Sequence, residues 1–598
     1  MPIFKKTPKI LPTPWTDQIN RELPWPEYPR PQLQRASWQN LNGLWHFKKT
    51  RKNASFPGTF PETILVPYPI ESMLSGVGKP LLPSERLWYQ KNFQIYSDLK
   101  GKRVLLNFGA VDWESDIYIN KIKVGTHRGG YCPFSFDITD YLQPGDNSIV
   151  VSVWDPTDKG KQEHGKQVLT PNFIWYTAVS GIWQTVWLEV VSEHYIDHLY
   201  IQPDLDRELI KIDIEIADLI PDLTLNIDIK QIDVLISKKV DQTTTNIEIP
   251  ITQPKLWSPE NPYLYDVDIS LGKDGERLDH VQSYFGMRKI SIGKDKQGNT
   301  RMMLNNEPYF QLGVLDQGYW PDGLYTPPTD DAMRFDIEYL KKSGFNMIRK
   351  HVKVEPARYY YYCDRLGMIV WQDLINGGRT PKKLWFVGKN NSSKFDDKKG
   401  YKQVGRNSIK NRHQFEKELK ELINHLKFFT SIAVWVPFNE GWGQFDSVRM
   451  TNLIKNIDQG RLVDHASGWF DQGEGDFKSI HRYFKPLTTL QSEKLRAVVL
   501  SEFGGYSLFL SDHVWDEHKI FGYKSFQNKK DMLIAYQTIL KKELLPWVKQ
   551  GLSASVFTQT TDVEIEINGL LSYDRKVIKL NSDDVRELHR AIIDASPN

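Results

Sequence analysis

The sequence predicts a multidomain β plus α/β protein of three parts: an N-terminal jelly-roll β-sandwich over residues 1–193, an immunoglobulin-like β-sandwich over 194–290 and a C-terminal (β/α)8 TIM barrel over 291–598. Three observations lead to this prediction. A chain of 598 residues is too long for one hydrophobic core. Its first half alternates apolar and polar residues at period two, and its second half alternates apolar strands with helical stretches.

The two predicted sandwiches consist of short strands separated by turns rich in Gly, Pro and Asn. In the first, segments such as 104–127 and 147–155 alternate without intervening helices, which is typical of a β-sandwich. In the second, about a hundred residues of cleaner alternation fit an immunoglobulin-like fold. Two of its strands each place four aliphatic side chains on one face: Ile210, Ile212, Ile214 and Ile216, and Leu223, Leu225, Ile227 and Ile229.

The predicted barrel has eight strands rich in Val and Ile, most of them followed by a helical stretch, as parallel strands buried on both faces require. Glycine tolerates the left-handed conformation that ends a helix, and Pro356 fits the first turn of one. Four glycines are expected to end helices in this way: Gly344, Gly367, Gly460 and Gly551. The eight strands are 309–314, 345–352, 368–375, 432–440, 462–467, 479–483, 497–503 and 554–562.

Composition excludes several classes of protein. The 77 basic and 74 acidic side chains leave a formal charge of +3, which gives no case for a nucleic-acid partner. No run of 18 apolar residues that would span a membrane is present, and no signal-peptide segment is visible. A cytoplasmic protein is therefore expected, or a secreted one if a leader was removed. Cys132 and Cys363 favour a reduced protein, although a single bridge between them stays open.

Two glutamates stand where a barrel places its catalytic groups, at the C-terminal ends of strands. Glu440 ends the fourth predicted strand, and Glu502 ends the seventh. Glycosidic cleavage needs two carboxyl groups, one to protonate the departing oxygen and one to attack or stabilise the sugar cation. The alternative is that each glutamate is a surface residue or a salt-bridge partner, which is the commoner role of a single Glu.

Motifs around these glutamates resemble those of glycoside hydrolase family 2, which includes β-galactosidases, β-mannosidases and β-glucuronidases. WVPFNEGWGQFD (435–446) is similar to its acid/base signature, and LSEFGG (500–505) is similar to its nucleophile signature. The similarity extends over nearly the whole chain. NLNGLWHF (40–47) and SGIWQTVWLE (180–189) resemble its sugar-binding sandwich, and LWSPENPYLYDV (256–267) resembles its immunoglobulin-like domain.

The resemblance implies a role for each matching residue. Glu440 would be the general acid/base and Glu502 the nucleophile. Asn439 would bond the 2-hydroxyl of the sugar, Tyr483 would bond Glu502, and Arg349 would keep Glu502 ionised. For Arg349 an ordinary barrel salt bridge is the alternative.

Further substrate-binding candidates lie at or near strand ends. A structural role is the alternative for His481 and for the tryptophans among them. His351 shares a strand face with Arg349. The flat rings of tryptophans are possible platforms for sugars, with core packing equally open. The candidates are His351, Asp316, Asp373, His481, Trp442, Trp469 and Gln559, with Thr558 and Asp562 beside the last.

Four departures from the family pattern qualify the resemblance. Residues 427–431 replace an Arg-Asn-His-Pro-Ser motif, and Arg349-x-His351 replaces Arg-x-x-His. Asn568-Gly569-Leu570 stands where glucuronidases carry Asn-x-Lys, which counts against a uronic-acid substrate. The long basic segment 376–411 is expected to shape the substrate entrance, with a solvated loop as the alternative.

These observations predict a retaining exo-β-glycosidase acting on an oligosaccharide or glycoside, with β-galactosidase-like activity as the first choice. A β-mannosidase, glucosidase or arabinosidase, a transglycosylase, and a non-catalytic carbohydrate-binding protein are the alternatives. The chain has no HExxH, CxxC pair, Walker or GxSxG motif. No organic cofactor is expected, and no cluster of metal ligands is evident. The family resemblance also suggests a possible homo-oligomer.

Overall fold

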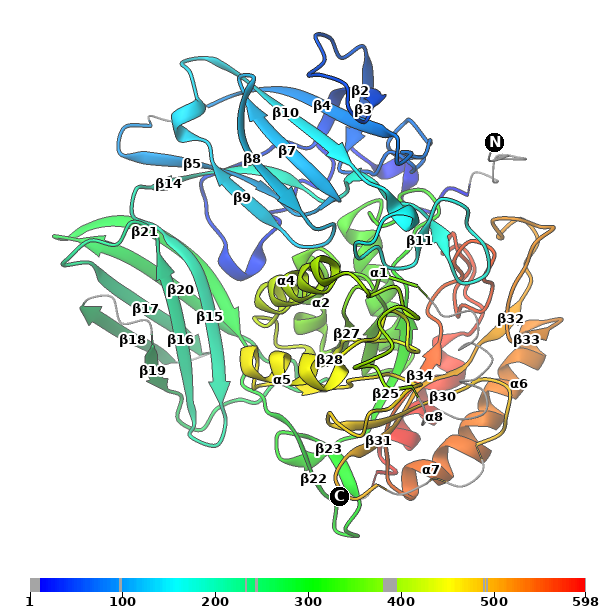
Figure 1. The fold of residues 1–598 in the computed structure, drawn as a ribbon. Helices are drawn as coiled ribbons and strands as arrows, with labels where there is room; N and C mark the ends of the chain where they lie inside the picture. The colour runs from blue at the N-terminus through cyan, green and yellow to red at the C-terminus, as the bar shows by residue number, and fades with distance from the viewer. Residues whose placement is uncertain are drawn as a thin grey trace.

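The computed structural model describes residues 11–95, 99–231, 234–241, 246–379, 395–487, 490 and 493–596. Its parts follow the chain in order: a β-sandwich at the top of Figure 1, a second sandwich at the left, and a barrel surrounded by helices. The predicted fold class is confirmed. Across the described residues, no helix has both the length and the apolar character needed to cross a membrane. Cys132 and Cys363 are both buried and free, so no disulfide joins them.

The first sandwich packs a six-stranded sheet against a four-stranded one. Apolar side chains from both sheets form its core, among them Trp45, Tyr89, Phe108, Val151 and Leu188. The larger sheet, in the order β3-β2-β4-β10-β7-β8, has strands Gly43–Arg51 (β2), Glu62–Val66 (β3), Glu85–Gln94 (β4), Glu114–Ile119 (β7), Ile122–Arg128 (β8) and Asp146–Trp154 (β10). The smaller sheet, β1-β14-β5-β9, has Trp38–Asn40 (β1), Lys102–Phe108 (β5), Phe134–Asp137 (β9) and Val186–Ser192 (β14). Four two-residue strands are Val111–Asp112 (β6), Gln167–Val168 (β11), Tyr176–Thr177 (β12) and Gly181–Ile182 (β13).

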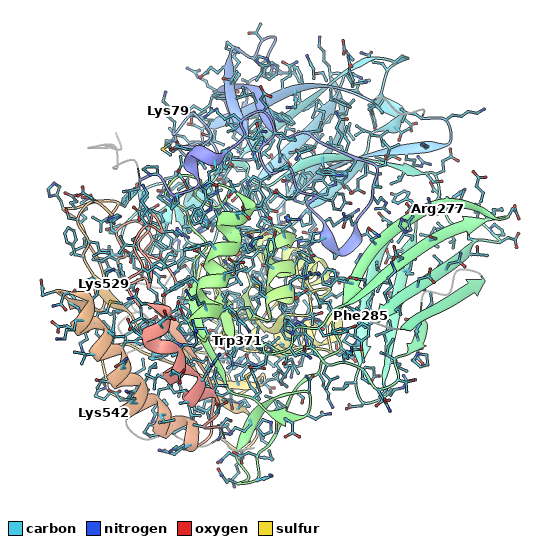
Figure 2. The ribbon with its side chains drawn as sticks, turned by 180° about the vertical axis from the view of Figure 1, so that it is seen from behind. Lys79, Arg277, Phe285, Trp371, Lys529 and Lys542 are labelled. Atoms are coloured by element: carbon cyan, nitrogen blue, oxygen red, sulfur yellow. The ribbon has the colours of Figure 1, made fainter. Side chains whose placement is uncertain are left out.

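The second sandwich has sheets β15-β16-β19 and β18-β17-β20-β21. The aliphatic faces predicted from the sequence are buried, except that Ile216 at the end of its strand is half-buried. Figure 2 shows the far tip of this domain at Arg277 and its end nearest the barrel at Phe285. The strands are Ile196–Asp204 (β15), Leu209–Ile216 (β16), Thr224–Gln231 (β17), Val234–Asp241 (β18), Ile247–Pro250 (β19), Tyr265–Lys273 (β20) and Glu276–Phe285 (β21).

The barrel contains all eight predicted strands, in parallel and in the order β29-β28-β27-β26-β25-β34-β31-β30. Pairing of β25 with β34 joins its two halves, and between β29 and β30 the Asp476 amide donates to the Val463 carbonyl at 2.9 Å. Its interior is filled by apolar side chains such as Trp371, which Figure 2 labels. The strands are Gln311–Asp316 (β25), Met347–Lys350 (β26), Ile369–Asp373 (β27), Ile432–Val436 (β28), Leu462–Val463 (β29), Phe477–Arg482 (β30), Ala497–Gly504 (β31) and Leu552–Thr558 (β34).

Helices alternate with most of these strands. The Thr329 side chain accepts the Ala332 amide at 3.1 Å and so caps the first helix. The helices are Asp330–Lys342 (α1), Ala357–Leu366 (α2), Ile409–Leu426 (α4), Ser447–Ile457 (α5), Lys529–Ile539 (α6), Leu545–Lys549 (α7) and Ser582–Ile593 (α8). The remaining strands are Ile290–Lys294 (β22), Thr300–Leu304 (β23), Glu307–Pro308 (β24), Tyr506–Leu508 (β32) and Lys524–Phe526 (β33), and a π-helical turn, Leu540–Leu544, joins α6 to α7.

Three of the four predicted helix-ending glycines have the expected backbone. Gly367 is the left-handed C-cap of α2 with φ +73°, and Gly344 and Gly551 also have positive φ. The prediction for Gly460 is wrong, because its φ is not positive. Helix α5 already ends at Ile457, and the Gly460 amide bonds the Asp458 side chain at 3.0 Å.

Candidate active site

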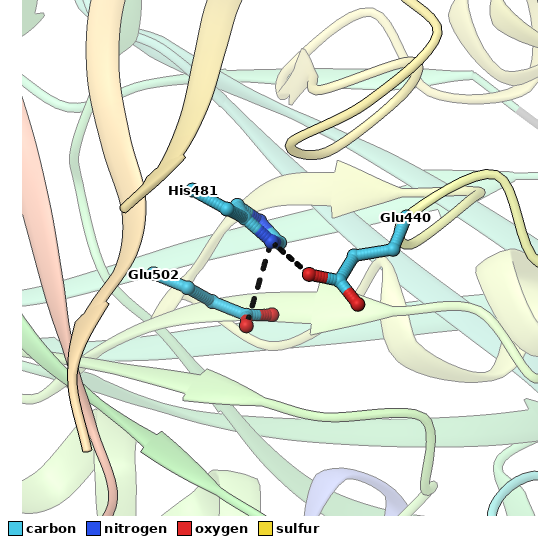
Figure 3. Close-up of side chains that lie close together, drawn as sticks. All are labelled: Glu440, His481 and Glu502. Atoms are coloured by element: carbon cyan, nitrogen blue, oxygen red, sulfur yellow. Dashed lines mark hydrogen bonds and ion pairs between the residues drawn. The ribbon is translucent and has the colours of Figure 1, made fainter. Parts of the chain in front are cut away.

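Two glutamates and a histidine meet at the C-terminal end of the barrel strands, as Figure 3 shows. His481 Nδ1 lies 2.9 Å from Glu440 Oε1 and 3.4 Å from Glu502 Oε2. One carboxylate oxygen of each glutamate and the imidazole nitrogen all lie within 4.8 Å of one another. The structure therefore brings together two carboxyl groups that are remote along the chain.

The local backbone explains how the two carboxylates reach this position. Glu502 lies within the buried strand β31, whereas Glu440 follows β28 and has φ +50°, a conformation that residues other than glycine adopt infrequently. The Glu440 amide donates to the Ser467 carbonyl at 2.9 Å, and the Ser467 amide donates to the Phe438 carbonyl at 2.9 Å. These two bonds attach the turn carrying Glu440 to the segment that follows β29.

Arg349 is the centre of the polar network behind the pair, and it is fully buried. Its Nη1 donates to Glu502 Oε1 at 3.1 Å, and its Nη2 donates to Asn439 Oδ1 at 2.9 Å. A bidentate pair with Asp373, at 3.0 and 3.1 Å, fixes the guanidinium plane. The Arg349 side chain thus links two other predicted residues, Asn439 and Asp373, to Glu502.

The surroundings of Glu502 favour its ionised form. Burial would raise the pKa of this carboxyl, but the charges of His481 and Arg349 and the bond from Tyr483 outweigh burial and lower it. Tyr483 Oη donates to Glu502 Oε2 at 2.5 Å and lies 2.9 Å from Thr558 Oγ1. An ionised carboxylate is what a nucleophile requires.

The two histidines near the pair are held by defined partners. His351 Nδ1 lies 2.6 Å from Asp373 Oδ2, and burial lowers the pKa of His351 well below its usual value. The other nitrogen of His481, Nε2, lies 3.1 Å from Ser467 Oγ. The His481 side chain is only 1% exposed, so its contacts with the two glutamates are shielded from solvent.

Three of the predicted sugar-binding residues form hydrogen bonds or ion pairs within the protein. Asp316 pairs with Lys350 at 2.7 Å, and Asp562 pairs with Lys579 at 2.6 Å. The Gln559 amide accepts from Gln317 at 2.9 Å and donates to Asn568 at 2.7 Å. The predicted contacts of Asp316, Asp562 and Gln559 with a sugar stay a prediction.

The two tryptophans predicted as stacking faces pack against protein. Trp442 is buried, and its ring meets Trp175 of the first sandwich edge to face at 4.8 Å. Trp469 packs beside a small apolar cluster of Phe395, Val404 and Phe470. Trp442 therefore packs in the protein interior, whereas Trp469 is only half-buried, and a sugar-stacking role for either ring stays a prediction. Of the long segment 376–411, residues 380–394 lie outside the described residues, so its predicted role at the entrance stays a prediction.

Sequence reasoning missed the contribution of the first sandwich, because nothing along the chain marks a residue so remote from the barrel. Burial lowers the pKa of Lys166, while the carboxylates of Glu566, Glu502 and Glu440 act on it in the opposite direction. Lys166 Nζ lies 5.7 Å from the centre of the Tyr176 ring. Glu566, after strand β34, accepts a hydrogen bond from Tyr176 Oη of the same sandwich.

Contacts with the barrel hold the segment that carries Lys166. Glu163 and Arg406 form a buried ion pair at 2.5 and 2.7 Å. The amides of His164 and Gly165 donate to the Asn376 carbonyl at 3.2 and 3.0 Å. Because these contacts immediately precede Lys166, they attach its segment to the barrel.

The expectation that the chain holds no metal stays a prediction, although the geometry groups three potential ligands. Within the described part of the chain, Glu440, His481 and Glu502 are the one group of three potential ligands close enough to share an ion. The same atoms make the carboxylate pair and its histidine bridge. Two carboxyl groups at this spacing, on the C-terminal face of a (β/α)8 barrel, are the arrangement that glycoside hydrolases use.

Comparison with protein families agrees with this class. The sugar binding domain of glycosyl hydrolases family 2 matches residues 38–191, a second family 2 domain matches 194–288, and the family 2 TIM barrel domain matches 327–496. The chain belongs to glycosyl hydrolases family 2.

Individual relatives carry different names. The chain is 27% identical over 392 residues to a putative beta-glucuronidase of Formosa agariphila, covering 64% of this chain and 34% of the relative. It is 26% identical to a beta-galactosidase of Thermoanaerobacter pseudethanolicus, covering 62% and 47%. The chain thus spans a third to a half of the length of these curated relatives. A Dictyoglomus thermophilum beta-D-glucuronidase structure has the same fold, with a TM-score of 0.72, 17% identity and coverage of 94% and 98%.

Proposed function

We propose that this protein is a retaining exo-β-glycosidase that removes terminal β-linked sugars by double displacement. This proposal rests on one distance: a carboxylate oxygen of Glu440 and one of Glu502 lie within 4.8 Å of each other. Retaining enzymes hold their two carboxyl groups about 5–5.5 Å apart, whereas inverting enzymes leave roughly 6.5–9.5 Å for a water molecule. The short separation favours retention.

Each glutamate has one task in the first step. Ionised Glu502 attacks the anomeric carbon and forms a glycosyl ester, while the bond to the leaving oxygen breaks and Glu440 gives that oxygen its proton. In the second step Glu440 takes a proton from water, the water oxygen bonds the anomeric carbon, and the ester to Glu502 breaks. Asn439, held by Arg349 at 2.9 Å, is positioned to bond the sugar 2-hydroxyl.

A neutral sugar, β-galactoside first, is the substrate that the site residues support best. Lys166 offers hydrogen-bond donors, and Glu566, whose charge acts on Lys166 most strongly, offers acceptors. A donor and an acceptor together suit hydroxyl groups, which both donate and accept. Asn568-Gly569-Leu570 also lacks the lysine of the glucuronidase motif.

A β-linked uronic acid is the second candidate. The charges of Glu566, Glu502 and Glu440 favour the protonated form of the buried Lys166, and a cation is what a sugar carboxylate would require. Some relatives are named beta-glucuronidases. A panel of nitrophenyl β-galactoside, β-mannoside, β-glucoside and β-glucuronide distinguishes the two candidates, and we expect the β-galactoside to be cleaved with the highest kcat/KM.

Glu502→Gln tests the reaction itself. The variant keeps the size of the side chain and removes the nucleophilic charge, so turnover on the best nitrophenyl glycoside should fall by several orders of magnitude. Glu474→Gln, at an exposed position in the loop before strand β30, is the matched control and should retain full activity. Near-normal turnover by a folded Glu502→Gln variant would exclude Glu502 from the mechanism.

A further inference from the structure

A network of hydrogen-bonded side chains leads from a buried aspartate to the acid/base glutamate. Asp464 Oδ2 accepts from Ser479 Oγ at 2.9 Å, and Ser479 Oγ lies 3.3 Å from Ser467 Oγ. Ser467 Oγ lies 3.1 Å from His481 Nε2, and His481 Nδ1 lies 2.9 Å from Glu440 Oε1. The Asp464 network, which consists of Asp464, Ser479, Ser467 and His481, thus ends on Glu440.

Asp464 is a carboxyl group whose burial requires an explanation. It is fully buried, and burial raises its pKa, although the charge of Arg349 and the bond from Ser479 act in the opposite direction. Across the described residues, the bond from Ser479 is its one side-chain hydrogen bond, and its Oδ1 has no partner. Because burial of a carboxyl group is unfavourable, the place of Asp464 next to the carboxylate pair suggests a functional role that acts through Ser479.

The aspartate sets the direction of the hydrogens along the network. A serine hydroxyl has a single hydrogen, and that of Ser479 goes to the Asp464 carboxylate. Ser479 can therefore only accept from Ser467, and Ser467, once it donates, accepts from His481 Nε2. The bond at one imidazole nitrogen determines the state of the other. His481 is thus held with its hydrogen on Nε2 towards Ser467 and with Nδ1 towards Glu440.

The backbone beside Ser467 holds the ring of His481 in place. Gly468 has φ +85°, and a Cβ at this position would overlap the atoms of the His481 ring. Glycine permits this close approach. Ser479 and His481 are two residues apart on strand β30, so their side chains lie on the same face of the strand. The imidazole is therefore fixed by the backbone at Gly468 and by a contact at each nitrogen.

The contact with His481 involves one oxygen of Glu440. Figure 3 shows that the other oxygen points away from the imidazole. The Glu440 side chain is 19% exposed, whereas that of His481 is 1% exposed. Glu440 can therefore meet a substrate directly, and His481 can act on the reaction only through the glutamates that it contacts.

We propose that Asp464, Ser479, Ser467 and His481 are positioning residues for the acid/base glutamate: they hold the Glu440 carboxyl group so that its second oxygen meets the leaving oxygen. This inference rests on the proposed function of Glu440. The same orientation serves both steps, since Glu440 gives its proton to the leaving oxygen and later takes a proton from water. General acid–base catalysis contributes roughly 100-fold to 10,000-fold to a rate, and a carboxyl group that turns away loses part of it.

The dependence of activity on the leaving group tests this role. Dinitrophenolate leaves without a proton, whereas a phenol leaving group needs one from Glu440. Ser467→Ala interrupts the network and keeps the backbone bonds between Ser467 and the Glu440 turn. On a phenyl β-glycoside of the sugar that the wild type cleaves best, its kcat/KM should fall by about tenfold or more. On the dinitrophenyl glycoside of the same sugar, kcat/KM should stay unchanged. Ser479→Ala, which touches neither His481 nor Glu440, should show the same pattern.

The second step gives an independent readout. In both variants kcat on the dinitrophenyl glycoside should fall, because water needs Glu440 as a base to attack the glycosyl ester. Azide is an anion that attacks without a base. Sodium azide should therefore restore kcat in Ser467→Ala and Ser479→Ala, with a glycosyl azide as product, and change the wild type little. A loss of kcat that azide does not restore would contradict the role in positioning Glu440.

Ser555→Ala is the matched control. Ser555 is a fully buried serine of the barrel strand β34, and among the described residues its Oγ has no hydrogen-bond partner, so this variant should keep wild-type rates on both glycosides. Equal losses on the two glycosides in Ser467→Ala and Ser479→Ala would indicate a merely structural role and overturn the inference. Wild-type rates on the phenyl glycoside would overturn it too. A wild-type protein that cleaves neither glycoside would instead refute the proposed function of Glu440, and this inference with it.

Discussion

At the scale of single residues, Arg349 determines how the site is held. Its Nη1 contacts Glu502, its Nη2 contacts both Asn439 and Asp373, and its Nε contacts Asp373, each at 2.9 to 3.1 Å. A guanidinium is suited to this task because its donors point in fixed directions within one plane. The same contacts pair the charge of Arg349 with the carboxylates of Glu502 and Asp373. They also orient Asn439, the residue that precedes Glu440.

Tyr483→Phe should shift the pH dependence of activity. Tyr483 lowers the pKa of Glu502 by donating to its ionised form, so loss of the hydroxyl raises that pKa. The acid limb of kcat/KM should move to higher pH, because Glu502 must be ionised to attack. A hydrogen bond to a charged group contributes about 1.5–3 kcal/mol, which corresponds to a roughly tenfold to hundredfold loss of kcat.

Thr558→Val is the matched control for this prediction. It removes the 2.9 Å contact to Tyr483 and leaves the bond between Tyr483 and Glu502 in place. Its acid limb should stay close to that of the wild type. A Tyr483→Phe variant with an unmoved acid limb would show that the hydroxyl does not act on Glu502.

The principal site residues could be predicted because strand ends are identifiable from sequence. Glu440 and Glu502 follow apolar strands, and a parallel barrel gathers strand ends at one face. Lys166 could not be found in this way, since it comes from a loop of another domain. Asp316 also lies at a strand end, but its carboxylate forms an ion pair with Lys350. The sequence does not show which partner a carboxylate of this kind binds.

At the scale of elements, the sandwich loop that carries Lys166 is the distinctive feature. A buried ion pair between Glu163 and Arg406 and backbone bonds to Asn376 attach this loop to the barrel. The loop is therefore fixed to the barrel, although it belongs to another domain.

Arg406→Met should destabilise the protein strongly, because it leaves the Glu163 carboxylate buried and unpaired. Removal of one partner from a buried pair typically costs about 3–5 kcal/mol. The double variant Glu163→Leu with Arg406→Met should be less destabilised than Arg406→Met alone, since no charge is left unpaired. The midpoints of urea unfolding check this order, and the reverse order would contradict it.

The strands were more predictable than the helix ends. Every predicted barrel strand is present, because a buried parallel strand is a continuous apolar run. Gly460 shows the limit of the pattern. The Asp458 side chain bonds the Gly460 amide, so the turn forms without a left-handed glycine.

At the scale of the whole molecule, buried polar contacts join the C-terminal helix to the rest of the barrel. His589 of α8 is fully buried, with Nδ1 2.7 Å from the Ser343 carbonyl and Nε2 2.9 Å from Tyr536 Oη. Burial lowers the pKa of His589 from 6.5 to about 4, so the folded state holds it neutral.

The contribution of His589 to stability should therefore depend on pH. Between pH 6.5 and 4 the unfolded chain binds a proton that the folded chain does not, so this contribution is present above pH 6.5 and is lost as pH falls towards 4. Relative to His589→Gln, the wild type should lose about 2 kcal/mol between pH 7 and pH 5. Urea unfolding at the two pH values measures this, with exposed His518→Gln as control. A constant difference would contradict the buried neutral histidine.

The arrangement of the whole chain serves to place Glu502 opposite Glu440, and covalent trapping of the nucleophile tests that claim most directly. A 2-deoxy-2-fluoro β-glycoside with a good leaving group slows breakdown of the glycosyl ester, so the intermediate accumulates. Mass spectrometry of the digested protein should find one sugar, on the peptide that contains Glu502. Labelling of a different carboxylate, or turnover without any labelled peptide, would contradict the assignment.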